Sequence, residues 1–268
     1  MIFSRPIEEV IKMRHSVRNY SDEKVSAEIL ESTFEYIKKI DNPFQGDVSI
    51  YLVTKEDLPG DIKLGTYGMI KGGNYFLIGV SGEEDKDKLA LGYMLEKAVL
   101  FLTDQGLGTV WLGGTFNRSE FEKTVSILGH QKVRIVIPFG YEGGKKSILG
   151  MLAGSNRTKR KNFEEIFFDQ EKGKPLSEEG AKEFFLPFEM MRQAPSGVNK
   201  QPWAAIKKGE EIDFYMTDRT NLSLIDMGIA ISHFAIACEE KNIHGRLEQK
   251  NKKESNSLGE YIATWSNK

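Results

Sequence analysis

The strongest constraint on the fold is an internal repeat of a long apolar helix. Residues 92–108 have a counterpart in residues 228–244, at an offset of 136 positions. Both segments are rich in apolar residues, continue into acidic residues and end at a helix-stopping Gly or Asn. Because these helices are apolar on nearly all sides, we expect each to lie buried between other elements.

A second pair of segments repeats in the same order. Residues 25–28, Val-Ser-Ala-Glu, correspond to residues 176–179, Leu-Ser-Glu-Glu, at an offset of 151. Each pattern predicts a helix start, in which Ser26 or Ser177 accepts hydrogen bonds from free backbone amides and a glutamate lies in the first turn. Chance similarity between amphipathic helices is the alternative explanation, and two matches in the same order argue against it.

Short runs of apolar and β-branched residues around these helices predict strands. They lie at residues 48–53, 75–80, 133–137, 203–206, 212–216 and 261–265. Helices and strands are mixed within each half, so we predict an α+β fold that is internally duplicated. The join lies between Gly150 and Lys161, which gives a first half of residues 1–155 and a second half of residues 156–268.

The charge balance excludes several classes of function. Lys and Arg number 37 and Asp and Glu number 39, a net charge of −2 over 268 residues. Such a chain has no broad attraction for nucleic acid or anionic lipid. No apolar run reaches the ~20 residues of a membrane-spanning helix. The first residues include Glu8 and Glu9 where a secretion signal would be apolar, so we expect a cytoplasmic protein.

Cysteine and histidine usage argues against disulfides and a protein-built metal site. The single cysteine, Cys238, has no partner for an intramolecular disulfide. The histidines, His15, His130, His233 and His244, have no metal-ligand spacing.

Residues 14–20, Arg-His-Ser-Val-Arg-Asn-Tyr, form the first candidate binding motif. In an extended chain Arg14, Ser16 and Arg18 point to one face. Two guanidinium groups and a hydroxyl on one face form a compact receptor for a phosphate monoester. The alternative is a solvated basic turn before a helix.

Residues 194–203, Ala-Pro-Ser-Gly-Val-Asn-Lys-Gln-Pro-Trp, form the second candidate. Pro195, Gly197 and Pro202 predict an irregular loop between a helix and a strand. This loop can present backbone groups, Ser196 and Asn199 to a planar polar ligand. The alternative is a structural turn.

Two further segments are weaker signals. Gly113 and Gly114 lack side chains, so a ligand ring can approach their backbone amides closely. Their spacing matches neither a Walker loop nor a dinucleotide fingerprint. The basic cluster of residues 157–161, taken alone, is typical of a solvated linker.

In combination these motifs resemble the nitroreductase-like flavoprotein family. The resemblance rests on residues 14–20, 106–114, 137–141 and 194–203, and it covers most of the chain. It implies an α+β subunit that forms a homodimer and binds FMN at the subunit interface. In that family the Arg-x-Ser-x-Arg-like segment of one subunit holds the phosphate, and the Pro-Ser-x-x-Asn loop comes from the other.

This chain departs from the family pattern because each motif occurs once, in different halves. The offset of 151 aligns Arg14, Ser16 and Arg18 with Glu165, Phe167 and Asp169, which would repel or exclude a phosphate. Residues 42–45, Asn-Pro-Phe-Gln, stand where the first half would carry the Pro-Ser loop, and no Gly-Gly pair follows His244. We therefore predict a fused pseudodimer that retains one of two sites and is a monomer in solution.

The resemblance implies that the flavin performs the chemistry and that the protein supplies no catalytic residue. Tyr67 is expected near the flavin edge as a substrate contact. The expected cofactor-binding residues are Arg14, His15, Ser16, Arg18, Gly113, Gly114, Arg157, Lys159, Arg160, Pro195, Ser196 and Asn199.

The expected function is that of an FMN-dependent oxidoreductase. NADH or NADPH would reduce the flavin, and a nitro compound, quinone or similar small acceptor would then reoxidise it by a ping-pong mechanism. A flavin-binding or flavin-sensing protein without efficient turnover is the alternative. A structural relative without a ligand is a third hypothesis.

Overall fold

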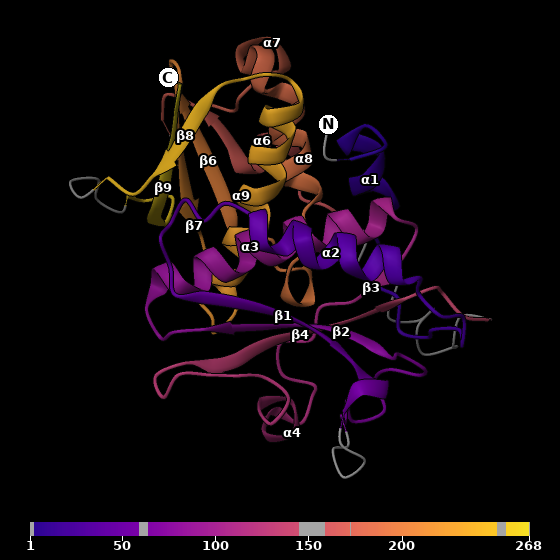
Figure 1. Ribbon diagram of the computed structural model, residues 1–268. Helices are drawn as coiled ribbons and strands as arrows, with labels where there is room; N and C mark the ends of the chain where they lie inside the picture. The colour runs from indigo at the N-terminus through magenta and orange to yellow at the C-terminus, as the bar shows by residue number, and fades with distance from the viewer. Residues whose placement is uncertain (1–2, 59–63, 145–158, 172, 251–255, 268) are drawn as a thin grey trace.

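The chain folds into two sheet-and-helix units that meet along a pair of long helices (Figure 1). The computed structural model describes residues 3–58, 64–144, 159–171, 173–250 and 256–267. The elements of the first unit are α1 (Ile7–Met13), α2 (Ala27–Lys39), β1 (Val48–Thr54), η1 (Lys55–Asp57), β2 (Tyr75–Ser81), α3 (Asp85–Asp104), β3 (Gly108–Thr109), α4 (Arg118–Glu122) and β4 (Lys132–Gly140). Those of the second are α6 (Phe163–Ile166), β5 (Phe167–Asp169), α7 (Glu178–Ala181), η2 (Lys182–Phe184), α8 (Phe185–Gln193), η3 (Gly197–Asn199), β6 (Trp203–Lys208), β7 (Glu211–Met216), α9 (Ser223–Glu240), β8 (Gly245–Glu248) and β9 (Glu260–Asn267).

Both sheets have the same internal order. The first sheet has the order β1-β2-β4-β3, and the second contains β6-β7-β9-β8 with β5 added at one edge. Within these sets of four strands every pairing is antiparallel. The long helix follows the second strand of each set along the chain. The predicted α+β class is confirmed, and all six predicted strand positions lie within observed strands.

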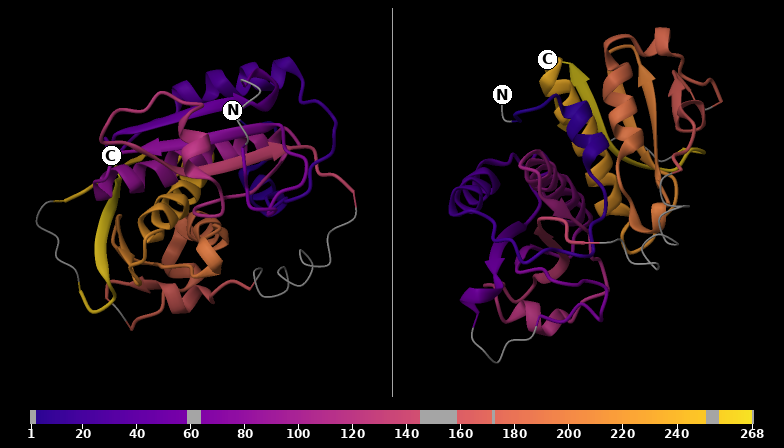
Figure 2. Two further views of the ribbon diagram at one scale, coloured as in Figure 1. Left: turned by 90° about the horizontal axis from the view of Figure 1, so that it is seen from below. Right: turned by 90° about the vertical axis from the view of Figure 1, so that its right-hand side faces the viewer.

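The two long helices, α3 and α9, lie between the sheets (Figures 1 and 2). They approach each other most closely at two glycines, Gly92 and Gly228. A Cβ atom on Gly92 would lie 2.0 Å from the carbonyl oxygen of Ile225, and one on Gly228 would lie 2.1 Å from that of Leu89. These contacts are reciprocal, because Gly92 and Gly228, like Leu89 and Ile225, are 136 positions apart. Self-complementary contacts of this kind occur across two-fold interfaces.

The close crossing predicts that Gly92→Ala destabilises the protein by about 3 kcal/mol, because the new methyl group would displace backbone atoms. The measurement is urea unfolding followed by circular dichroism. Gly114→Ala is the matched control, since no heavy atom of the described residues, apart from adjoining ones, lies within 4 Å of a Cβ there. Equal unfolding midpoints for the two variants would contradict the tight crossing.

Both long helices end as the sequence predicts. Gly106 and Asn242 have positive φ values of 80° and 56°. The next residue of each turn, Leu107 or Ile243, donates its amide to the carbonyl of the residue five positions earlier, at 3.0 and 2.9 Å. This is the Schellman arrangement of a helix C-terminus. The helices begin earlier than the repeat indicates, at Asp85 and Ser223.

The N-terminal segment joins both units and thereby fixes the start of the first motif. The Ser4 amide donates to Asp104 on α3 at 2.6 Å, and the Ile7 amide donates to Glu240 on α9 at 2.6 Å. Helix α1 ends at Met13, and the next residue, Arg14, has an extended backbone.

The predicted helix start at Ser177 is confirmed, because Ser177 Oγ accepts from the Gly180 amide at 3.0 Å. The helix is short, however: it breaks at Lys182, which has a φ of 53°, and the chain becomes α-helical again at α8. Pro187 explains the restart, because a proline in a first helical turn breaks no hydrogen bond, whereas one in a helix interior does.

The alignment of Arg14 with Glu165 does not hold in space. Ser16 lies beside Thr109 of β3, whereas Phe167 lies beside Ala205 of β6, at the other end of the strand order. Glu165 instead belongs to a capping box with Asn162, which starts the short helix α6 just before β5. Repulsion by Glu165 therefore gives no support to the predicted loss of a second site.

No helix in the described parts of the chain is long and apolar enough to cross a membrane. Among the same residues no group of three or more His, Cys, Asp and Glu side chains could hold a metal ion. Cys238 is a buried free thiol in α9.

Candidate functional site

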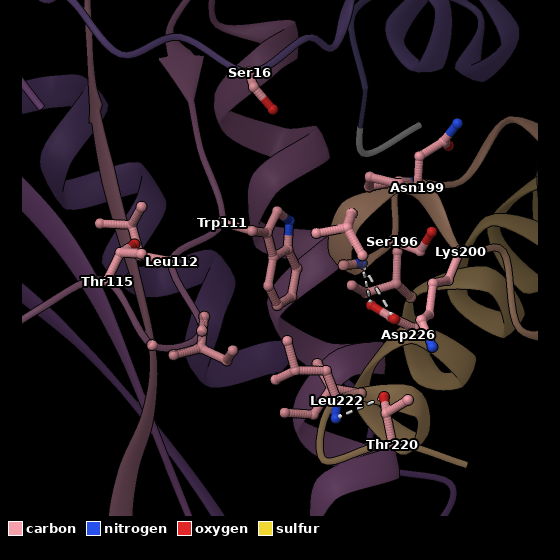
Figure 3. A pocket seen from close by; sticks show the side chains of 18 of the residues that line it. Ser16, Trp111, Leu112, Thr115, Ser196, Asn199, Lys200, Thr220, Leu222 and Asp226 are labelled. Atoms are coloured by element: carbon pink, nitrogen blue, oxygen red, sulfur yellow. Dashed lines mark hydrogen bonds between the residues drawn. The ribbon is translucent and has the colours of Figure 1, made fainter. Parts of the chain in front are cut away.

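A cavity of about 590 Å³ lies between the two units. The first unit contributes the N-terminal motif and residues 111–115, and the second contributes residues 195–200 and the start of α9. Figure 3 shows Leu112 and Thr115 on one side of this space, Ser196, Lys200 and Asp226 on the other, and the ring of Trp111 between them. The volume is in the ~300–1,000 Å³ range of small-molecule sites.

The first motif lies in the cavity wall as its alternation predicts. The Val17 amide donates to the Thr109 carbonyl at 2.9 Å, which holds the segment in an extended form. Val17 is buried in the opposite direction, while Arg14, Ser16 and Arg18 all line the cavity. One end of the cavity is therefore cationic.

Two guanidinium groups at this end have buried nitrogens without partners. Arg14 Nη1 and Arg160 Nε find no hydrogen-bond acceptor among the described residues. Burial lowers the pKa of Arg160 to about 10, with further lowering by the nearby charges of Arg14 and Arg192. Burial also lowers the pKa of Arg14, while the charge of Glu96 opposes this shift. Unpaired buried donors in mutually repelling cations indicate a place for an anion.

Arg160 is oriented toward the cavity by the second motif. Its Nη1 donates to Asn199 Oδ1 at 2.6 Å, and its Nη2 donates to the Gln193 carbonyl at 2.9 Å. Asn199 Nδ2 donates in turn to the Lys159 carbonyl at 2.9 Å. The basic cluster and the Pro-Ser loop therefore form one structure.

The loop of residues 195–201 has an unusual backbone. Val198, Asn199 and Gln201 have positive φ values of 47°, 59° and 50°. A positive φ is rare for a β-branched residue, so Val198 is strained. The loop is held by the Gln201 amide, which donates to Ser196 Oγ at 2.8 Å. Strain of this kind concentrates at binding sites.

Asp226 on α9 closes this side of the cavity. Its two carboxylate oxygens accept from the Gly197 amide at 3.0 and 3.2 Å (Figure 3). Burial raises the pKa of Asp226 to about 7, although the Gly197 hydrogen bond and the charge of Lys200 act in the opposite direction. A carboxyl group with such a shift in a cavity wall is typical of functional sites.

The glycine pair leaves part of the wall open to a ligand. A Cβ atom on Gly113 would meet Leu222 at 3.1 Å, whereas one on Gly114 would meet no heavy atom of the described residues, apart from its neighbours, within 4 Å. Both glycines line the cavity. Their backbone can therefore contact a bound ring closely.

The structure brings most of the predicted site residues together. Those that line the cavity are Arg14, Ser16, Arg18, Gly113, Gly114, Arg160, Pro195, Ser196 and Asn199. Lys159 is exposed and contributes its backbone carbonyl. Arg157 lies outside the described residues, as does the boundary between residues 155 and 156.

Two predicted residues lie elsewhere. The ring of His15 contacts Glu142 at 3.1 Å and the Met13 carbonyl at 3.0 Å, outside the described cavity lining. In an extended chain the side chain of His15 points to the face opposite to that of Arg14 and Ser16, which explains its position. Tyr67 is 71% exposed in a turn and also lies outside this lining, whereas Met69 is part of it.

Sequence reasoning missed Trp111 and Asp226 as site residues. Trp111 stands two positions before Gly113, within the glycine-containing segment of residues 106–114. Asp226 is an acidic residue in the first turn of an otherwise apolar helix, and this pattern alone could have drawn attention to it.

The fold and the cavity define an α+β protein with a small-molecule site between two sheet-and-helix units, cationic at one end. Residues 6–238 match the protein-family model described as "Putative TM nitroreductase". The chain belongs to this family.

Solved structures with a similar fold also have nitroreductase names. A "putative nitroreductase" of Thermotoga maritima is 21% identical, with 98% of this chain and 94% of that chain covered and a TM-score of 0.65. An "FMN-dependent Nitroreductase" of Clostridium difficile R20291 is 17% identical, covers 52% of this chain and 88% of its own, and has a TM-score of 0.42. A "putative nitroreductase in complex with fmn" of Desulfovibrio desulfuricans is 20% identical, with 56% and 95% covered and a TM-score of 0.43. The search of curated proteins finds no significant match.

Proposed function

We propose that the protein is an FMN-dependent oxidoreductase of the nitroreductase type. The observation that carries the proposal is the pair of buried, unpartnered guanidinium nitrogens of Arg14 and Arg160 at one end of a cavity with mainly apolar walls. A phosphate monoester joined to a large planar ring has matching chemistry at both ends. Family membership and the FMN named for two structural neighbours are consistent with this ligand.

The residues of the cavity fit FMN in the following way. Arg14, Arg18 and Arg160 would hold the phosphate together with the Ser16 hydroxyl. The Gly113 and Gly114 backbone would contact the ring, and Pro195, Ser196 and Asn199 would approach it from the other unit. When bound, the flavin would accept a hydride from NADH or NADPH and pass electrons to a nitro compound, quinone or similar small acceptor in a ping-pong sequence.

We also propose that the two units, residues 1–155 and 156–268, are duplicated halves that reproduce a family homodimer within one chain. The repeated strand order and the reciprocal Gly92 and Gly228 contacts support this proposal. Because the seam already covers the helix faces that a dimer would bury, we expect a monomer in solution.

The loop of the first unit that corresponds to the Pro-Ser loop is packed differently. Gly46 approaches Lys86 and Ala90 of α3. Gly197 approaches the equivalent residues of the second unit, Leu222 just before α9 and Asp226 within it, so the two loops correspond. Ala90, however, has no carboxylate at the position of Asp226, and the amide held in this loop is that of Asp47, which donates to Asp87 on α3 at 2.8 Å. Phe44 is buried there, with its ring 5.7 Å from that of Tyr93. The first loop thus packs as core, which supports a single site per chain.

This difference predicts one FMN per chain. The measurement is flavin absorbance after denaturation, divided by protein concentration, on protein reconstituted with FMN. Size-exclusion chromatography with light scattering gives the mass of the same sample. Two flavins per chain would contradict the single-site proposal.

The proposed activity is tested on the FMN-loaded protein under anaerobic conditions. We expect NADH or NADPH to bleach the flavin absorbance and a quinone such as menadione to restore it. Bound flavin that stays oxidised under excess reductant would identify a flavin-binding protein without turnover. Protein that takes up no FMN would refute the proposal.

A further inference from the structure

Trp111 is the large aromatic side chain of the cavity wall, and its orientation is fixed by a hydrogen bond. Its Nε1–H donates to Glu96 Oε2 at 3.0 Å. Figure 3 shows the ring of Trp111 between the side of the cavity that carries Leu112 and Thr115 and the side that carries Ser196 and Asp226. The indole ring therefore borders the space into which a ligand would enter.

The acceptor of this bond, Glu96, is itself held by a buried histidine of the other unit. Glu96 Oε1 lies 2.8 Å from His233 Nε2, and both side chains are completely buried. His233 Nδ1 lies 3.0 Å from the Met190 carbonyl. Because that carbonyl can only accept, Nδ1 is the donor in this hydrogen bond.

These bonds cross the seam between the units. Trp111 follows β3, Glu96 lies on α3, His233 on α9 and Met190 on α8. The position of the Trp111 ring thus depends on side chains from both units. Neither Glu96 nor His233 lines the cavity in its described part.

The other two tryptophans show that a partner for the indole is not a general feature of this fold. Trp203 Nε1 and Trp265 Nε1 are buried without an acceptor among the described residues. A buried carboxylate is costly to place in a protein interior. That carboxylate nevertheless serves the tryptophan at the cavity, which favours a role in the site over a role in packing.

We infer that Trp111 is the aromatic wall for the ring system of the bound cofactor, and that Glu96 and His233 are positioning residues for this wall. The inference rests on the proposed function, since the flavin supplies the planar ring. A fixed indole offers a stacking surface without a cost in side-chain ordering at the moment of binding. Arg14 and Arg160 would select the phosphate, and Trp111 would select the ring.

Two experiments test the role of Trp111 and the role of Glu96 separately. Trp111→Ala is expected to weaken FMN binding about 10- to 100-fold, in line with the loss of one stacking contact. Trp265→Phe is the matched control, because Trp265 lies on β9 outside the described cavity lining, and its FMN affinity should equal that of the wild type. Fluorescence titration of the apoprotein with FMN gives each dissociation constant.

The support is tested without any cofactor. In apoprotein labelled with nitrogen-15, Glu96→Ala should shift the Trp111 indole N–H resonance and speed its exchange with solvent. Glu96→Gln should preserve both, because its amide oxygen accepts from the indole and its amide nitrogen donates to neutral His233. The resonance is assigned from its loss in Trp111→Phe.

The outcomes are distinguishable. Wild-type protein that binds no FMN would refute the proposed function and with it the role of the wall. If the wild type binds FMN and Trp111→Ala binds it with the same affinity, the role of Trp111 as the wall is refuted, while the proposed function stands. If Glu96→Ala changes neither the indole N–H resonance nor the affinity for FMN, the positioning role of Glu96 is refuted. If Glu96→Ala does not fold, Glu96→Gln takes its place, and weaker FMN binding by Glu96→Gln would refute the positioning role.

Discussion

Arg14→Glu is expected to lower the affinity for FMN at least about 100-fold, corresponding to about 3 kcal/mol or more. Arg14 Nη1 is buried without an acceptor among the described residues, at the cationic end of the cavity. The substitution removes a charge-assisted hydrogen bond to the phosphate and places a carboxylate beside it in a partly desolvated site. Titration of the apoprotein with FMN, followed by flavin fluorescence, measures the change.

Riboflavin gives the sharper form of this experiment, because it has the same ring without the phosphate. Arg14→Glu should erase most of the preference for FMN over riboflavin and change riboflavin binding little. Arg246→Glu is the control for charge reversal, since Arg246 is 66% exposed on β8. Full flavin occupancy in Arg14→Glu at low free FMN, or equal losses for both ligands, would contradict the assignment of the phosphate end.

The sequence predicted those parts of the fold that depend on local patterns. The ends of α3 and α9 were predictable because Gly106 and Asn242 adopt the left-handed conformation that terminates a helix. The side of the N-terminal motif that faces the cavity was predictable from the two-residue period of an extended chain. The same period explains why His15 points away.

Features that depend on long-range packing were not predictable. The three residues of β5 pair with β6, and nothing in so short a segment specifies its partner. The misplaced equivalence of Arg14 and Glu165 has this cause. The hydrogen bonds of Trp111 to Glu96 and of Asp226 to Gly197 join residues 15 and 29 positions apart. Spacing alone does not reveal such pairs, whereas the crossing of α3 and α9 and the loop geometry create them.

Asp226 is expected to make folding stability fall as the pH rises from about 4 to about 7. Burial raises the pKa of this carboxyl to about 7 from an ordinary value of 3.8. Between these values the folded state binds the proton more tightly than the unfolded state, so each rise in pH costs stability until the pKa of the folded state is passed. Over the roughly three pH units between these two pKa values, the loss of folding stability is on the order of 4 kcal/mol.

Asp226→Asn isolates this contribution, because an amide oxygen can still accept from Gly197 N–H and the side chain stays neutral at every pH. Urea unfolding of both proteins at intervals from pH 4.5 to 8 gives the difference in free energy. The variant should gain stability over the wild type as the pH rises, with a plateau above about pH 8. Asp22→Asn is the control, because it removes an exposed carboxylate: its free energy of unfolding should change with pH nearly as that of the wild type does. If the free energy of unfolding of Asp226→Asn also changes with pH as that of the wild type does, the prediction is wrong. The Asp226 carboxylate would then be ionised in the cavity wall without loss of stability, because Lys200 and the Gly197 amide compensate its burial fully.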